Sequence, residues 1–203
     1  MFASLRRFVL AATLVLLAPA AAHAADSVTL HDLVIGKPDA PVTINEYSSY
    51  DCPHCATFHA ENRPWLIKTF VDTGRAKLVF ADYPLSGLAM AAAMLVHSAP
   101  EDTRQVLSDA LFSEQRVWAT AENPRQALGT LAGLAGMSQQ QVDKALADKA
   151  LFQALLDRRA YAFEKLGVDS TPTLIINGQK IMANASQEDL SKAIETAEAG
   201  LKK

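Results

Sequence analysis

The sequence predicts an α/β fold in which a βαβ unit and a ββα unit are separated by a helical insertion. Three observations support this prediction. Residues 42–47 and 76–83 have the β-branched content and the alternation of strands, and a helical stretch lies between them. Residues 85–167 contain no credible strand but place apolar residues at helical spacing. Asn177-Gly178 then joins two further strand-like runs, which is a strong signal of a β-hairpin.

Residues 1–24 have the layout of a secretory signal peptide. Two arginines precede an apolar run at residues 8–18, and small residues follow up to an expected cleavage site after Ala24. An apolar run this short does not span a bilayer, which takes about 20 helical residues. An uncleaved anchor and export by the twin-arginine route are the alternatives. We therefore expect residues 25–203 to be the mature, exported protein and to form one domain.

Composition limits the classes of partner. The formal net charge is −3 and half of the residues are hydrophobic. A mildly acidic chain without basic blocks argues against binding to nucleic acid or to anionic lipid. A chain this apolar can build a core without structural disulfides, unlike small cysteine-rich secreted domains.

The first unit begins with a strand at residues 42–47, after a short entry segment at residues 25–37. Because side chains alternate across a strand, Val42, Ile44 and Glu46 share one face. We therefore expect the Glu46 carboxyl to point into the fold.

A helix at residues 56–73 and a strand at residues 76–83 complete the βαβ unit. Gly74 is a natural end for the helix. Two strands joined by a crossover helix are expected to be parallel neighbours in the sheet.

The insertion at residues 85–167 is expected to form four or five helices, with breaks near Pro100, Pro124 and Gly136. It is too apolar to be a linker. We expect it to pack as a helical cap on the sheet.

The second unit consists of strands at residues 173–176 and 179–182 followed by a helix. Ser186, with Asp189 three residues later, is the signature of a capped helix start.

The only two cysteines, Cys52 and Cys55, enclose Pro53 and His54. A structural zinc site needs further ligands, usually a second cysteine pair or a spaced histidine pair, and neither is present. Haem attachment requires a histidine where Ala56 stands. A disulfide that closes so short a loop would stabilise the fold by only about 2 kcal/mol. These arguments favour a pair that carries redox chemistry.

The position of the pair at a helix start explains its spacing. With Cys52 as N-cap, Pro53 occupies the first helical position, where proline is favoured. The Cys52 sulfur can then accept hydrogen bonds from the backbone N–H groups of His54 and Cys55, and the helix dipole adds a positive field. Both effects favour the thiolate, which is the nucleophile. We expect Cys52 to be the exposed attacking sulfur and Cys55 the sheltered resolving one, with a protonated His54 side chain as a further source of stabilisation.

The Cys-Pro-His-Cys motif, together with Ser170-Thr-Pro-Thr173 ahead of a strand and the helical insertion, resembles the DsbA family of thiol:disulfide oxidoreductases. The resemblance covers nearly all of residues 25–203 and implies a thioredoxin fold with an inserted helical subdomain. It also implies a cis peptide at Thr171–Pro172 beside the cysteines, with the Thr171 backbone offered to an extended substrate. Glu46 matches the family's buried acid, which could exchange protons with the resolving sulfur.

The resemblance implies an enzyme that donates its Cys52–Cys55 disulfide to reduced, unfolded exported proteins and is re-oxidised by a DsbB-like membrane quinone reductase. No cofactor is expected. A monomer is expected because the segment before the first strand is too short for a dimerisation module. Two alternatives stay open: a disulfide isomerase or reductase of the same fold, and a periplasmic metal-handling module that uses the two cysteines and a histidine. The sequence does not give the redox potential, and so leaves the direction of electron flow open.

Overall fold

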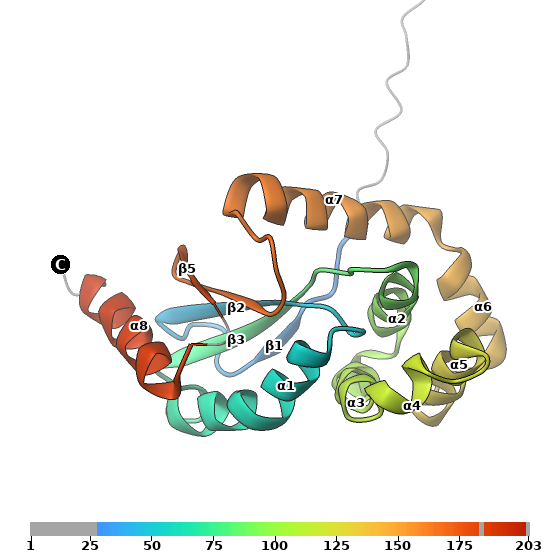
Figure 1. Ribbon diagram of the computed structural model, residues 1–203, viewed down its shortest axis with the longest axis horizontal. Helices are drawn as coiled ribbons and strands as arrows, with labels where there is room; N and C mark the ends of the chain where they lie inside the picture. The colour runs from blue at the N-terminus through green and yellow to red at the C-terminus, as the bar shows by residue number, and fades with distance from the viewer. Residues whose placement is uncertain (1–27, 183–184, 202–203) are drawn as a thin grey trace, which may run out of the picture.

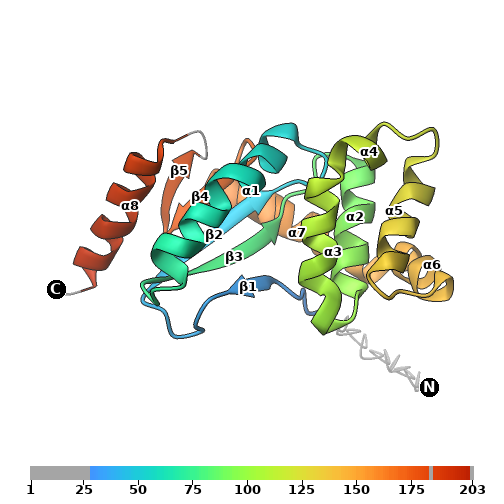
Figure 2. The same cartoon turned by 90° about the horizontal axis from the view of Figure 1, so that it is seen from below.

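The computed structural model describes residues 28–182 and 185–201. The predicted signal peptide at residues 1–24 lies outside the described residues. The described chain forms a mixed sheet flanked by helices, with a block of helices beside one end of the sheet (Figures 1 and 2).

The centre of the sheet is the predicted βαβ unit. Strand β2 (Val42–Ser48) pairs in parallel with β3 (Ala76–Asp82), with Glu46 opposite Phe80. Strand β4 (Thr173–Ile176) is antiparallel to β2, and β5 (Gln179–Met182) completes the predicted hairpin at the edge. The strand order β1-β3-β2-β4-β5 confirms the α/β fold class.

Strand β1 (Leu33–Ile35) corrects the interpretation of residues 25–37 as an entry segment without a strand. It pairs antiparallel to β3 at the other edge of the sheet. Three residues are too few to show an alternating pattern, and Val34 is half exposed. Pairing with β3, a tertiary contact, therefore decides this strand.

Helix α1 (Pro53–Leu66) begins directly after Cys52 and continues as a π-helical turn, η1 (Ile67–Val71). The helical stretch ends before Gly74, which has a φ of +75°, as expected for a glycine stop. It starts at Pro53, as expected with Cys52 as the N-cap residue, and so three residues before the helical pattern recognised at residues 56–73. The cysteine pair is therefore part of the first turn.

Two layers of helix enclose the sheet (Figure 1). Helices α1 and α8 (Gln187–Gly200) cover one face, where Val42, Ile44 and Leu78 are fully buried. Helix α7 (Lys149–Leu166) crosses the other face, where its Ala162 packs near Tyr83. The face that carries Val42 and Ile44 is also the face of Glu46, so this carboxyl points toward α1.

The insertion contains six helices in the described chain, one more than the upper limit of the prediction. They are α2 (Gly87–Ser98), α3 (Glu101–Ser113), α4 (Gln115–Ala119), α5 (Pro124–Leu134), α6 (Gln139–Ala147) and α7. Figure 2 shows α2 to α6 as a block beside the sheet. Glu114 alone separates α3 from α4, and no proline or glycine announces that break in the sequence.

Aromatic packing joins this block to the sheet. Tyr50, which follows β2, lies with its ring centroid 4.9 Å from that of Phe112 in α3 and 5.3 Å from that of Phe80 in β3. The Tyr50 hydroxyl donates to Ser108 Oγ of α3 at 3.0 Å. Burial raises the pKa of Tyr50 well above 10.0, so the phenol stays neutral and acts as a donor.

Removing the Tyr50 hydroxyl tests how much the hydrogen bond between Tyr50 and Ser108 contributes to stability. Tyr50→Phe leaves the fully buried Ser108 without its partner, so we expect the free energy of unfolding to fall by about 1 kcal/mol. Urea denaturation measures this loss. Tyr161→Phe on α7, where the side chain is 58% exposed, is the matched control and should leave stability unchanged. An equal loss in both variants would contradict a specific role for the Tyr50–Ser108 bond.

Candidate active site

The two cysteines lie at the N-terminus of α1. Cys52 is the N-cap residue with extended backbone angles (φ −83°, ψ 119°), and Pro53 occupies the first turn. Both cysteines are free thiols in this structure. Cys52 is 7% exposed, whereas Cys55 is fully buried. Only Cys52 therefore presents its sulfur to a reaction partner.

The pKa values of the two thiols are shifted in opposite directions. The pKa of Cys52 is lowered from 9.0 to about 5, mainly by a hydrogen bond from the Cys55 thiol. The Thr171 side chain and the backbone N–H groups of Cys55 and His54 lower it further, while burial acts in the opposite direction. Burial, together with the proton shared with Cys52, strongly raises the pKa of Cys55. The pair therefore holds one proton, and it resides on Cys55.

The helix cap at Cys52 is looser than the sequence predicted. No backbone N–H makes a hydrogen bond of full geometry with its sulfur. The N–H groups of His54 and Cys55 instead stabilise the thiolate by their proximity at the helix start. The Cys55 thiol, and not the cap, is the main partner of the Cys52 sulfur.

A tight turn before α1 shelters Cys55. The Cys52 N–H donates to the Ser49 carbonyl at 3.1 Å, which closes the turn. The Ser49 N–H in turn donates to Cys55 Sγ at 3.4 Å. The resolving sulfur is thus held against the backbone that enters the helix.

The Ser170-Thr-Pro-Thr173 segment lies beside the cysteine pair. The Thr171–Pro172 peptide bond is cis. Cys52 Sγ lies 3.4 Å from the Thr171 carbonyl oxygen, across 119 residues of sequence, and can donate to it only when Cys52 is protonated. Thr171 Oγ1 is buried without a hydrogen-bond partner, so its proton is available to a thiolate.

A cavity of about 360 Å³ lies between α1 and this loop. Its lining includes His54 and Phe58 from α1, Thr171 and Pro172 from the loop, and Met182 from β5. The His54 side chain is exposed at its rim. His54 contributes to the Cys52 thiolate through its backbone N–H.

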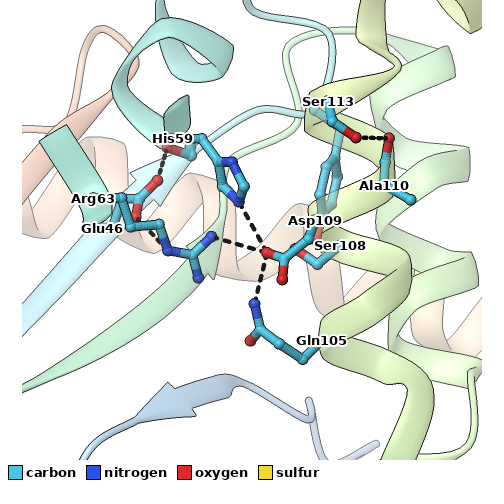
Figure 3. Close-up of polar contacts among 10 residues, drawn as sticks. Glu46, His59, Arg63, Gln105, Ser108, Asp109, Ala110 and Ser113 are labelled. Carbon is cyan, nitrogen blue, oxygen red and sulfur yellow. Dashed lines mark hydrogen bonds and ion pairs between the residues drawn. The ribbon is translucent and has the colours of Figure 1, made fainter. Parts of the chain in front are cut away.

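The Glu46 carboxylate is fully buried, and Figure 3 shows it beside Arg63. Oε1 accepts a hydrogen bond from Ser48 Oγ at 2.7 Å, and Oε2 lies 3.9 Å from Arg63 Nε of α1. Arg63 Nη1 lies 3.7 Å from Asp109 of α3, which also contacts His59 at 2.9 Å. Among the described contacts, none joins Glu46 to either cysteine. The sequence correctly predicted that Glu46 points into the fold. Its contacts with Ser48 and Arg63 were not predicted, and proton exchange with Cys55 stays a prediction.

Asp51, next to Cys52, makes contacts that the sequence did not predict. Its carboxylate accepts hydrogen bonds from the Ser49 and Ser86 hydroxyls, each at 2.5 Å. Ser86 is the N-cap residue of α2, where its side chain accepts from two backbone N–H groups. The turn before Cys52 is therefore tied to the insertion. No local pattern joins residues 35 positions apart, so only the tertiary structure discloses this contact.

The described residues offer neither a metal site nor a membrane-spanning helix. Among the described residues, no group of three or more histidine, cysteine or acidic side chains is arranged to hold a metal ion. No helix in residues 28–182 or 185–201 is both long and apolar enough to cross a membrane. The metal-handling alternative therefore lacks a third ligand beside Cys52 and Cys55 in this part of the chain.

Comparison with known proteins gives a consistent family. A family model described as thioredoxin matches residues 28–196. Disulfide bond formation protein D of Bacillus subtilis is 29% identical over 170 residues, which cover 80% of this chain and 75% of that protein. A putative protein-disulfide oxidoreductase of Rickettsia bellii is 24% identical and is covered over 64% of its length, so this chain spans less than two thirds of that relative.

Solved structures share the fold. The crystal structure of Wolbachia pipientis alpha-DsbA1 superposes with a TM-score of 0.74 at 24% identity, covering 84% of this chain and 94% of that chain. Oxidised BdbD from Bacillus subtilis gives a TM-score of 0.69 at 26% identity, covering 81% of this chain and 91% of that chain.

The reduced protein should show one thiol titration near pH 5, with Cys52 as thiolate above it and thiol below it. Thr171→Val removes a donor to that thiolate and should raise the pKa of Cys52 by about one unit, since a hydrogen bond to a charged group contributes roughly 1.5 kcal/mol. The ultraviolet absorbance of the thiolate against pH measures both. Thr130→Val, at an exposed position of α5, is the control and should not shift the Cys52 titration. An unshifted transition in Thr171→Val would exclude the hydroxyl as a donor.

Proposed function

This chain belongs to the thioredoxin family as a DsbA-like thiol:disulfide oxidoreductase, and from that premise we propose that it is a periplasmic oxidase that introduces disulfides into newly exported proteins. The observation that carries the proposal is the pair of opposed thiol pKa shifts. With a Cys52 pKa of about 5, thiolate exceeds thiol by about a hundredfold at pH 7. Stabilising the thiolate stabilises the reduced enzyme, and this makes the disulfide form a strong oxidant.

In the proposed reaction, a substrate thiolate attacks Cys52 Sγ of the Cys52–Cys55 disulfide. The bond between the two enzyme sulfurs breaks, and Cys55 leaves as a thiolate that takes up a proton, which burial then retains there. A second substrate thiolate attacks the substrate sulfur of the mixed disulfide and expels Cys52 as a thiolate. The substrate loses two electrons and gains one disulfide, while the enzyme gains the two electrons. The low pKa makes Cys52 a good leaving group in the second step.

The cavity beside the cysteines supports an extended polypeptide as substrate. It combines apolar surface from Phe58, Pro172 and Met182 with the exposed His54 at its rim. We propose that the substrate backbone pairs with Thr171, whose carbonyl oxygen lies 3.4 Å from Cys52 Sγ. Such pairing uses main-chain hydrogen bonds and so depends little on the substrate's side chains, which suits unfolded proteins of different sequence.

Re-oxidation requires an acceptor for two electrons, and we propose the disulfide of a DsbB-like membrane quinone reductase. The Cys52 thiolate would attack that disulfide and form a mixed disulfide, since Cys55 is fully buried. Cys55 would then lose its proton and attack Cys52 Sγ, which re-forms the Cys52–Cys55 disulfide and releases the partner with both of its sulfurs reduced. Proton exchange between Glu46 and Cys55 is not part of the proposal, because Ser48 and Arg63 engage that carboxylate.

Single-cysteine variants test the division of roles. Cys55→Ala lacks the resolving sulfur, so we expect it to accumulate mixed disulfides between Cys52 and substrate, detected by non-reducing electrophoresis and mass spectrometry. Cys52→Ala leaves only the buried sulfur and should form none. The reverse pattern would exchange the roles of the two cysteines.

The equilibrium of the cysteine pair with glutathione tests the direction. We expect a potential well above the roughly −270 mV of thioredoxin and toward the roughly −120 mV of DsbA. The fraction of oxidised protein in glutathione buffers of defined ratio measures it. A potential near that of thioredoxin would identify the protein as a reductase instead.

A further inference from the structure

Gln115, the first residue of α4, forms hydrogen bonds with the backbone of the active-site turn, residues 50–52. Its side-chain Nε2 donates to the Tyr50 carbonyl at 2.6 Å and to the Cys52 carbonyl at 2.9 Å. Gln115 is only 5% exposed. A side-chain amide nitrogen has two hydrogens, and here both are directed at carbonyls of one short turn.

One of these carbonyls belongs to the residue that reacts. The Cys52 carbonyl also accepts the first bonds of α1, from the N–H groups of Cys55 at 3.0 Å and Ala56 at 3.1 Å. Its orientation therefore defines both the start of the helix and the direction in which the Cys52 side chain leaves the backbone. A donor on this oxygen also offsets negative partial charge close to the sulfur.

The three residues of the turn are held by three different helices of the insertion. The Tyr50 hydroxyl bonds α3, the Asp51 carboxylate bonds Ser86 at the start of α2, and the Cys52 carbonyl bonds Gln115 of α4. Only the bond from Gln115 contacts the reactive residue itself. Gln115 is therefore the most direct connection between the insertion and the chemistry.

We propose that Gln115 is a positioning residue for the thiol–disulfide exchange: its buried amide fixes the Cys52 backbone so that the sulfur stays directed at the helix N-terminus and Thr171. The helical insertion is then a determinant of reactivity as well as a cover for the sheet. The inference deepens the proposed function. It rests on Cys52 being the reactive thiolate and not on the direction of electron transfer.

The test compares the Cys52 titration in variants of the full chain. Gln115→Met keeps the length of the side chain but removes both donors, so we expect the pKa of Cys52 to rise by about one unit, a tenfold loss of thiolate relative to thiol below the transition. Gln115→Glu replaces the donors by acceptors when ionised, and the rise should be larger. The rate of alkylation at pH 5 should fall about fivefold, since the thiolate fraction falls from about one half to about one eleventh.

Two controls separate positioning from general destabilisation. Gln126→Glu introduces the same charge on the exposed surface of α5 and should leave the titration unchanged. Ser108→Ala weakens the joint between α3 and the turn without touching Cys52, so it should lower stability but not shift the pKa of Cys52. If Gln115→Met loses stability while its Cys52 titration stays at the wild-type position, the role of Gln115 is structural only and the proposal is wrong.

A measurement on the wild-type protein covers the case in which the Gln115 variants do not fold. The side-chain amide resonances of Gln115 should shift in NMR spectra with the same midpoint as the Cys52 thiolate. Resonances that do not respond would overturn the proposal. A wild-type protein without any thiol transition near pH 5 would contradict the proposed function, whereas a normal transition that ignores Gln115 would contradict this inference alone.

Discussion

The interaction between the two sulfurs is the one on which the rest of the site depends. An anion on Cys52 is stable because the Cys55 thiol donates to it, and the proton stays on Cys55 because that sulfur is fully buried. The two pKa shifts are therefore one interaction seen from both sides. It requires a difference in burial across a single helical turn, and the helix start supplies it: Cys52 at the N-cap position is 7% exposed, whereas Cys55 at the third helical position is fully buried.

The sheet topology explains why the other half of the site lies in a distant part of the chain. Because β2 and β3 are parallel, their carboxyl ends lie at the same end of the sheet, where the cysteine turn leaves β2. Strand β4 runs antiparallel to β2 and therefore begins at that end, with Thr173 opposite Tyr47. The Thr171–Pro172 loop directly precedes β4, so it lies at the same end of the sheet as Cys52 and contacts it. The antiparallel return, and not proximity in sequence, brings the two signatures together.

How much the sequence could predict follows from the range of each signal. The Asn177-Gly178 hairpin and the proline after Cys52 are local, and the structure has both where the sequence indicated them. Alternation gave the face of Glu46 but not its neighbouring charge, Arg63, because the period of a strand does not disclose the side chain opposite. Gln115 was missed because a single glutamine in a helical stretch resembles a solvated residue, and its carbonyl partner at Cys52 is 63 positions away.

Buried polar contacts explain how an apolar insertion can hold the turn in one geometry. Arg63 has a side chain only 3% exposed and lies between Glu46 of β2 and Asp109 of α3, so seating the insertion on the sheet brings a second carboxylate close to its charge. A second buried pair, His97 of α2 with Asp82 of β3 at 2.9 Å, makes the same connection. Such pairs add little net stability, but separating one leaves an uncompensated buried charge. The hydrogen bond between His97 and Asp82 is directional and fixes the separation of α2 and β3, whereas apolar packing is not directional. The insertion can therefore present donors to the active-site turn at fixed distances, which a purely apolar cap would not guarantee.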